Sequence, residues 1–212
     1  MCRGLVPITV PPEYRVFFFC GDWRLGPRQL PTQGLLGDIL EGYDRLGGLT
    51  AVHFLDRWWD PIKEDWRYPR DDGFARNAQG PIAAPTSLEV GQLVDRFGNE
   101  SGRFLSPAGV KFGQRAIPPS NLNTEDPRFP NDYHLYKVAK AVTVCAGPAA
   151  PAFEQPGGGL QYATSSDACS SPSRVTVGNL VANGTLVPVA VPFTEGKSMP
   201  LKRPAGVKAA AR

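Results

Sequence analysis

Arg96 and Arg115 lie in two separate short segments in the middle of the chain, DRFG (95–98) and QRAIPP (114–119). A guanidinium group can bind two phosphate oxygens at once through its planar set of N–H donors. Two such groups from different segments could therefore hold a pyrophosphate. The alternative is a surface salt bridge, which is the usual role of an arginine. The residue types and spacing alone favour that alternative.

Phe97 and Phe104 flank a short stretch that contains Gly98 and Gly102. The glycines permit a tight turn that could bring both rings to one slot. Such a slot would hold a flat cationic ring by cation–π attraction. Packing in an ordinary core is the simpler interpretation, and the residues alone favour it.

The triple glycine at 157–159 precedes Gln161. It does not match the GxGxxG fingerprint, and no helical pattern follows, so a Rossmann dinucleotide site is excluded. A glycine-rich turn allows the backbone to approach a ligand closely. It could place Gly158 and Gly159 against a substrate and fix the position of the Gln161 side chain. The alternative for Gln161 is a polar strand residue that faces solvent.

These segments, in this order, resemble the catalytic domain of the tuberculosis necrotizing toxin and its fungal relatives, the surface NAD glycohydrolases. The resemblance is carried by DRFG (95–98), GRFLSP (102–107), QRAIPP (114–119) and FEQPGGGLQY (153–162). GDWRLGP (21–27), WRYP (66–69) and DGF (72–74) are similar to the fungal branch, and the resemblance extends over residues 14–190. It implies hydrolysis of the bond between nicotinamide and ribose in NAD+, which releases nicotinamide and ADP-ribose.

The resemblance also implies roles for single residues. Arg96 and Arg115 match arginines of the family's NAD site, Phe97 and Phe104 match aromatic residues of its nicotinamide pocket, and Gln161 matches its catalytic glutamine. We therefore expect Gln161, Arg115 and Arg96 to act in catalysis.

This set of residues contains no general acid, although glycoside hydrolysis commonly uses paired carboxylates. Nicotinamide is cationic in NAD+ and leaves as a neutral molecule, so it needs no proton. The enzyme has mainly to orient the ribose, exclude bulk water and stabilise a transition state that resembles an oxocarbenium ion. Asp95 and Glu154 lie near the motifs, and we expect them to form structural hydrogen bonds with nearby turns.

His53 and His134 are the only histidines, and neither lies in a nucleophile motif. His134 alternates with its neighbours in YHLY (133–136) as a strand residue does, so we expect a structural role. The resemblance to the bacterial branch also suggests a catalytic histidine, but neither histidine of this chain can be matched to it securely. We expect no cofactor. A calcium site, which the fungal relatives suggest, is doubtful because Glu195 is the only acidic residue after Asp167.

The composition indicates a globular chain. Hydrophobic residues make up 42% and charged residues 20%, with a formal net charge of +3. This balance excludes a disordered polyelectrolyte and argues against a nucleic-acid partner. No stretch of apolar residues approaches the length needed to span a bilayer.

The four cysteines, Cys2, Cys20, Cys145 and Cys169, form two sequence-local pairs and permit three disulfide connectivities. Two sequons, at Asn99 and Asn183, are candidate glycosylation sites. Together these features favour a secreted or cell-surface protein, with a cytoplasmic location as the alternative.

The fold expected is α+β: a small helical N-terminal region followed by a compact, mainly antiparallel β catalytic core. The apolar pattern predicts helices over 33–45 and from Thr50 to Trp59, followed by a packed tryptophan cluster. Residues 14–20 look β-prone, 76–87 resemble a linker, and short β-prone runs dominate from Leu88 onward, including 174–191. We divide the chain into 1–80, a catalytic core at 86–192 and a disordered basic tail at 195–212.

Two other functions are compatible with the sequence. The chain could be a non-catalytic secreted surface interaction module derived from this family, or an ADP-ribosyltransferase. NADP+ is an alternative substrate to NAD+. The fungal relatives suggest a homodimer to which the N-terminal region contributes.

Overall fold

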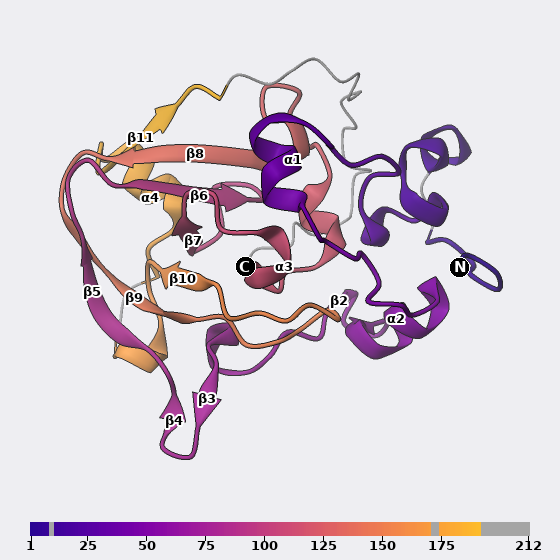
Figure 1. The fold of residues 1–212 in the computed structure, drawn as a ribbon, viewed down its shortest axis with the longest axis horizontal. Helices are drawn as coiled ribbons and strands as arrows, with labels where there is room; N and C mark the ends of the chain where they lie inside the picture. The colour runs from indigo at the N-terminus through magenta and orange to yellow at the C-terminus, as the bar shows by residue number, and fades with distance from the viewer. Residues whose placement is uncertain (9–10, 171–173, 192–212) are drawn as a thin grey trace.

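The computed structural model describes residues 1–8, 11–170 and 174–191. A seven-stranded sheet in the order β11–β8–β6–β7–β10–β9–β5 forms its centre (Figure 1). Every neighbouring pair in it is antiparallel. This confirms the expected α+β class with a mainly antiparallel β core. The strands are β5 (Ala84–Leu88), β6 (Leu93–Phe97), β7 (Phe104–Pro107), β8 (Tyr133–Val138), β9 (Val142–Pro148), β10 (Leu160–Ala163) and β11 (Leu186–Val189).

Both edge strands of this sheet contain a proline. Pro85 lies in β5 and Pro188 in β11. Proline has no N–H to donate, so it interrupts the row of donors on a free edge and opposes pairing with another chain.

Four short α-helices accompany the sheet: α1 (Gly34–Leu40), α2 (Ala51–Trp58), α3 (Phe112–Arg115) and α4 (Val177–Ala182). The Thr50 side chain caps α2 as the sequence predicted, accepting from the His53 N–H at 3.3 Å. α1 ends earlier than expected, and Gly42 follows it with a φ of 75°. α4 replaces a predicted β-prone run, because Thr176 and Asn179 form a reciprocal capping box.

The N-terminal segment differs most from the sequence prediction. Residues 14–20 were expected to be extended, but all except Phe18 lie in the 3-10 helices η1 (Pro12–Phe17) and η2 (Phe19–Gly21), which η3 (Trp23–Leu25) follows. Phe18 alone is extended and forms a β-bridge with Pro27. Cys20, which is bonded to Cys2, has a φ of 52°, and this backbone conformation is incompatible with a strand. The remaining 3-10 helices are η4 (Asp71–Gly73), η5 (Pro119–Leu122), η6 (Pro130–Asp132) and η7 (Asp167–Cys169).

The expected linker at 76–87 is also wrong. β3 (Arg76–Asn77) and β4 (Gly80–Pro81) form a hairpin, and β5 then pairs with β9 along its whole length. A separate small ribbon joins β1 (Trp59–Asp60) to β2 (Asp65–Trp66). The proposed tail at 195–212 lies outside the described residues.

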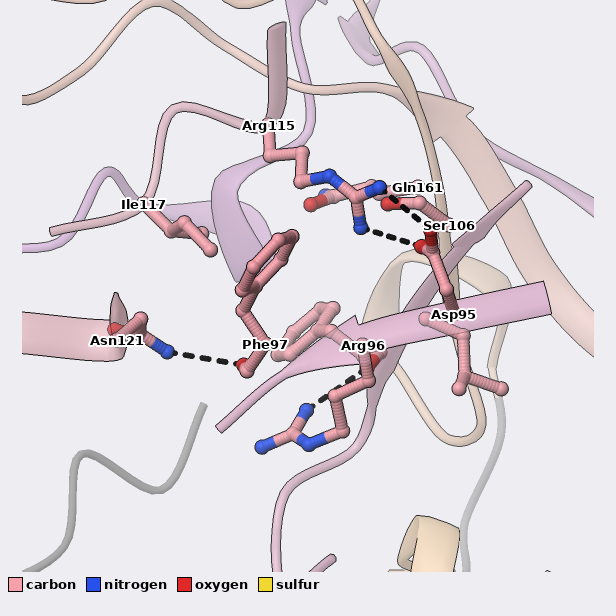
Figure 2. A pocket seen from close by; sticks show the side chains of 10 residues that line it. Asp95, Arg96, Phe97, Ser106, Arg115, Ile117, Asn121 and Gln161 are labelled. Atoms are coloured by element: carbon pink, nitrogen blue, oxygen red, sulfur yellow. Dashed lines mark hydrogen bonds and ion pairs between the residues drawn. The ribbon is translucent and has the colours of Figure 1, made fainter. Parts of the chain in front are cut away.

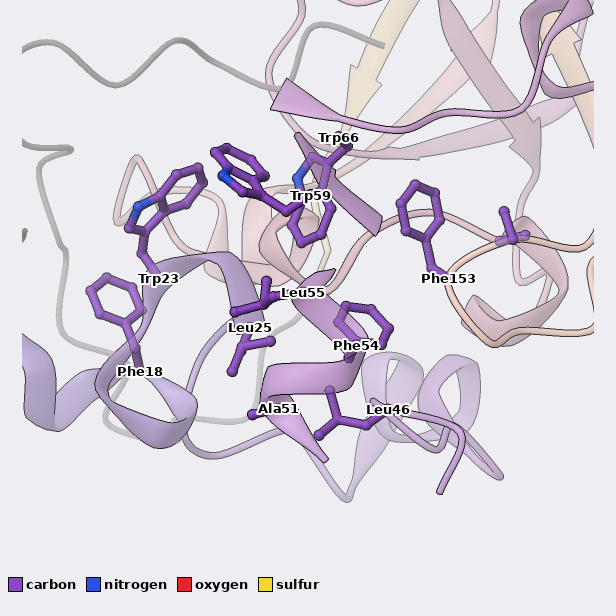
Figure 3. Packing of buried hydrophobic residues seen from close by; sticks show 12 residues of the cluster. Phe18, Trp23, Leu25, Leu46, Ala51, Phe54, Leu55, Trp59, Trp66 and Phe153 are labelled. Atoms are coloured by element: carbon purple, nitrogen blue, oxygen red, sulfur yellow. The ribbon is translucent and has the colours of Figure 1, made fainter. Parts of the chain in front are cut away.

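The predicted tryptophan cluster is present and connects the N-terminal region to the sheet (Figure 3). The rings of Trp59 and Trp66 meet edge to face with centroids 5.2 Å apart, and Trp66 also packs edge to face on Phe153 at 5.6 Å. Phe153 and Ala116 belong to the segments before β10 and after α3. The aromatic region therefore packs directly against the segments QRAIPP (114–119) and FEQPGGGLQY (153–162).

The disulfides join the two sequence-local pairs of cysteines. Cys2 is bonded to Cys20, and Cys145 to Cys169. The second bond ties η7 to β9, next to the pairing of Cys145 with Ala163 of β10. It therefore holds the region beyond β10 close to the sheet.

Candidate active site

A pocket lies where β6 and β7 separate. These two strands pair only at Val94–Pro107 and Asp95–Ser106, whereas the earlier part of β7 pairs with β10. Beyond Asp95 the sheet is therefore open between its strands. The enclosed space there is small, about 40 Å³, and it opens to solvent. Its lining residues, drawn in Figure 2, are Asp95, Arg96, Phe97, Phe104, Leu105, Ser106, Arg115, Ile117, Asn121 and Gln161.

The two predicted arginines approach this pocket from opposite faces of β6. Side chains alternate along a strand, so Asp95 and Phe97 point to one face and Arg96 to the other. Arg115, at the end of α3, lies on the Asp95 side (Figure 2). The opening between β6 and β7 is the feature that allows both arginines to line a single pocket.

Arg115 forms a buried bidentate pair with Asp95. Its Nη1 and Nη2 donate to the two carboxylate oxygens at 2.6 and 2.9 Å, and Nη2 and Nε also donate to the Val110 carbonyl. Asp95 accepts further from the Tyr133 hydroxyl at 2.9 Å and the Gly109 N–H at 3.0 Å. The planar fork expected to bind phosphate is therefore directed at a carboxylate. Asp95 has the structural bonding role that the sequence suggested, and it fixes Arg115.

Arg96 is also buried, with 3% of its surface exposed. Its Nε donates to the carbonyls of Gly98 and Asn99 at 3.1 and 2.7 Å, and its Nη1 donates to the Phe104 carbonyl at 2.8 Å. Burial lowers the pKa of Arg96 to about 10, so the side chain remains protonated at neutral pH. A positive charge is thus built into the wall of the pocket, where solvent screens it little.

Phe97 and Phe104 both line the pocket, as the sequence predicted. Phe97 is held by edge-to-face contact with Phe112 at 5.1 Å, and the Arg115 guanidinium lies 5.1 Å from the centre of its ring. Phe104 is partly exposed, with the Arg103 guanidinium 5.5 Å from its ring centre. One ring is therefore fixed in the core, and the other remains accessible from solvent.

Gln161 lies in β10, opposite Gly147 of β9, and is largely buried. Its Nε2 donates to the Asp72 carbonyl at 3.1 Å. A carbonyl can only accept, so the atom that faces it must be the amide nitrogen. Within the described part of the chain, no group donates to Oε1 of Gln161. The acceptor of this side chain is therefore available to a ligand in the pocket.

Gly158 and Gly159 are not among the lining residues. Gly159 instead donates to the Gln114 carbonyl at 3.0 Å, and a Cβ at this position would lie 2.8 Å from the Gln114 oxygen and from Val110 Cγ1. The glycine run allows the chain before β10 to approach α3 closely. The glycines thereby set the distance between Gln161 and Arg115.

Glu154 and the two histidines lie elsewhere. Glu154 accepts from Arg57 and from the Trp58 indole at 2.7 and 2.9 Å. His53 is exposed on α2, whereas His134 is buried in β8 and stacks on Phe129 with ring centroids 4.1 Å apart. Burial lowers the pKa of His134 to about 4, which keeps the ring neutral. None of the three residues lines the pocket.

Sequence reasoning missed several lining residues, of which Asn121 is the most polar. It lies in η5, is 7% exposed, and donates from Nδ2 to the Phe97 carbonyl at 3.2 Å. The available signal was its place two residues after Pro119, because Pro118 and Pro119 fix a turn that can present the next side chains in a defined direction.

Residues 87–189 match the family model described as tuberculosis necrotizing toxin. The match covers 103 of the 212 residues of this chain. All ten lining residues of the pocket lie within the matched range. The resemblance inferred from the motifs is therefore confirmed for the part of this chain that forms the pocket.

A curated relative and a solved structure are similar to it. The conidial surface nicotinamide adenine dinucleotide glycohydrolase nadA of Aspergillus fumigatus is 45% identical over 150 residues, which is 69% of this chain and 64% of that protein. The chain thus spans less than two thirds of the relative's length. The tuberculosis necrotizing toxin, solved in complex with its immunity factor, matches with a TM-score of 0.59 and 19% identity, over 86% of this chain and 98% of the other. This likeness shows a shared fold.

The described residues contain no cluster of three or more His, Cys, Asp or Glu side chains that could hold a metal ion. Within the same ranges, no helix is both long enough and apolar enough to cross a membrane.

Proposed function

We propose that this chain is an NAD+ glycohydrolase, which hydrolyses the bond between nicotinamide and ribose to give nicotinamide and ADP-ribose. The observation that carries the proposal is the convergence of Arg96, Arg115, Phe97, Phe104 and Gln161 on one pocket. These residues come from four separate elements, and the fold brings them together where the pairing of β6 with β7 ends. The similarity to a protein named as an NAD glycohydrolase supports the same activity.

The pocket suits one end of a dinucleotide. Its volume of about 40 Å³ is well below the roughly 300–1,000 Å³ of typical small-molecule sites, so it can receive only part of such a ligand. We infer that it takes the nicotinamide and its ribose, with the cationic ring against Phe97 and Phe104. The buried charge of Arg96 then attracts the pyrophosphate at long range, while its N–H groups hold the loop between β6 and β7.

The chemistry requires little from the protein beyond orientation. Nicotinamide departs with the electron pair of the broken bond and becomes neutral, and water adds to the ribose carbon and loses a proton to solvent. The Oε1 of Gln161 is an acceptor that can bind a ribose hydroxyl or the attacking water. It also places a partial negative charge beside the cationic transition state. Arg115 and Asp95 form a neutral pair that holds Phe97 in position.

Release of nicotinamide from NAD+ by the purified chain tests this proposal. We expect turnover by the wild type. In Gln161→Ala we expect kcat to fall about 100-fold or more, since a single polar group that stabilises the transition state contributes on that scale. Gln79→Ala, which changes an exposed glutamine of the β3–β4 hairpin, is the matched control and should behave as wild type. Absence of nicotinamide release from a folded wild-type chain would reject the proposal.

Two alternatives are separated by the products. An ADP-ribosyltransferase would attach label from NAD+ to added proteins, whereas a glycohydrolase yields free ADP-ribose. A non-catalytic interaction module would bind NAD+ without releasing nicotinamide. Parallel assays with NADP+ define the preferred substrate.

We further propose that residues 86–192 carry the catalytic core and that the protein is secreted or held at a cell surface as a homodimer. The disulfides and the surface location named for the relative support an extracellular site of action. Asn183 is exposed beside α4, and Asn99 lies on the loop after β6, so both sequons are candidates for glycans. Mass before and after enzymatic deglycosylation, and light scattering of the purified protein, test these points.

A further inference from the structure

The Asp72 residue of η4 lies directly behind the predicted catalytic glutamine, although the two are far apart in sequence. The Asp72 carbonyl is the acceptor for the Nε2 of Gln161 at 3.1 Å. Asp72 has a φ of 54°, in the left-handed region that non-glycine residues rarely occupy. The direction of its carbonyl depends on this conformation, so whatever stabilises the turn also aims the bond to Gln161.

The Asp72 carboxylate supplies that stabilisation. One oxygen accepts from Arg103 Nη2 at 3.1 Å, and the other accepts from Ser166 Oγ at 2.7 Å. Both partners are themselves fixed: Arg103 donates to the Ser165 carbonyl at 2.6 Å, and Ser166 caps η7 by accepting from the Ala168 N–H. The Cys145–Cys169 disulfide then ties η7 to β9, the neighbour of β10.

We propose that Asp72 is a positioning residue for the glycohydrolase reaction, which orients the Gln161 carboxamide so that Oε1 faces the substrate. The inference rests on the proposed function for its kinetic part. The terminal torsion of a glutamine is soft and has two nearly equivalent settings. A single acceptor behind Nε2 selects one of them, because rotating the amide would place Oε1 against the Asp72 carbonyl. Arg103 also connects Asp72 to the pocket wall, because its guanidinium, which donates to the Asp72 carboxylate, lies over the ring of the lining residue Phe104.

Asp71 provides a matched control within the same turn. It has the same φ of 54°, but its carboxylate pairs with Arg76 on the β3–β4 hairpin and not with the pocket. Replacing either residue by glycine keeps the left-handed conformation without strain. Asp72→Gly therefore removes the contacts to Arg103 and Ser166, whereas Asp71→Gly removes a contact that leads away from Gln161.

Kinetics of nicotinamide release measure the positioning effect. We expect Asp72→Gly to lower kcat about tenfold with a much smaller change in KM, since misplacement of a reacting group by a fraction of an ångström has effects on this scale. Asp71→Gly should remain within about twofold of wild type. In a Gln161→Ala background, Asp72→Gly should have no further effect on kcat, because the residue acts through the amide that is already absent. A full tenfold loss in that background, or wild-type kcat in Asp72→Gly, would overturn the proposal.

A spectroscopic measurement keeps the inference testable even if the protein does not hydrolyse NAD+. The side-chain amide signals of Gln161 can be assigned by their loss in Gln161→Ala. We expect Asp72→Gly to shift these signals and to speed exchange of the Nε2 protons with water, while Asp71→Gly leaves both unchanged. Identical Gln161 signals in wild type and Asp72→Gly would show that Asp72 does not hold the amide, whereas absent turnover with the expected shifts would reject only the proposed reaction.

Discussion

Arg96 donates from Nη1 to the Phe104 carbonyl at 2.8 Å, across the opening where β6 and β7 lose their backbone pairing. The guanidinium takes the place of the missing ladder bond and joins the two strands on either side of the pocket. Its Nε holds the loop between them through Gly98 and Asn99. Arg96 is therefore both part of the pocket wall and the link that keeps the pocket open.

Arg96→Lys should weaken both stability and activity. An ammonium group cannot reach carbonyls that a planar guanidinium spans, so buried acceptors lose their partners. We expect the free energy of unfolding to fall by about 2–4 kcal/mol, and kcat/KM to fall about 100-fold as the two strands shift. Urea denaturation and nicotinamide release measure the two effects. Arg57→Lys, in an exposed ion pair with Glu154, is the control and should change stability by under about 0.5 kcal/mol. Equal effects of the two substitutions would contradict the bridging role.

A second prediction concerns how much the buried Asp95–Arg115 ion pair contributes to stability. Asp95→Asn keeps the shape but removes the charge that compensates a buried guanidinium, so it should cost about 3–5 kcal/mol. Tyr133→Phe removes one hydrogen bond to the same carboxylate and should cost only about 1 kcal/mol. The exposed pair of Asp126 and Arg128 offers a matched Asp126→Asn control, for which urea denaturation should show almost no change. If Asp95→Asn were as mild as this control, the pair would not be the support of the pocket.

The lining residues found from sequence have one property in common. Their segments occur in the same order as the motifs of the family that they resemble. Two of these segments contain an arginine: DRFG (95–98), where a phenylalanine follows it, and QRAIPP (114–119), where two prolines come soon after it. What the sequence could not supply was how each side chain is used. The resemblance assigned Arg115 to the NAD site, whereas the residues alone favoured a salt bridge, and only the structure identifies Asp95, twenty positions away along the chain, as the partner.

Asp72 and Asn121 could not be predicted for a related reason. Each reaches the site through a backbone carbonyl contact that crosses between elements distant in sequence. The errors in local structure likewise have tertiary causes. α4 is rich in valine, which favours strands, but its capping box and the burial of Val177 and Leu180 outweigh that preference. The β propensity of residues 14–20 is likewise not realised, because Cys20 and Gly21 adopt positive φ values of 52° and 73°.

Gly159→Ala should lower activity although Gly159 does not line the pocket. The added Cβ would lie 2.8 Å from the Gln114 oxygen, so β10 and α3 must separate. We expect a loss of about 1–3 kcal/mol in stability and a fall in kcat as Gln161 moves relative to Arg115. A Cβ at Gly158 meets open space, although its φ of 80° strains the backbone by about 1 kcal/mol.

Comparison of these two variants distinguishes packing from ligand contact. Gly158→Ala should retain kcat and KM close to those of wild type, because no lining residue is displaced. A raised KM in Gly158→Ala would instead support the sequence-based expectation that this glycine touches the substrate. Thermal unfolding of both proteins separates the strain at Gly158 from the displacement at Gly159.

The lowered pKa of His134 allows a prediction of how the stability of the protein depends on pH. Its pKa is about 4 in the folded protein, mainly because of burial, against an ordinary value of 6.5. Between these values the unfolded chain binds a proton that the folded chain does not, so unfolding is favoured as the pH falls. The contribution is complete above about pH 6.5 and is lost progressively as the pH falls toward 4. His134→Phe preserves the stacking on Phe129 and cannot titrate. We therefore expect this variant to lose less stability than wild type between pH 7 and pH 4 in parallel urea titrations; parallel curves with the same slope would show that His134 is not the group that takes up the proton.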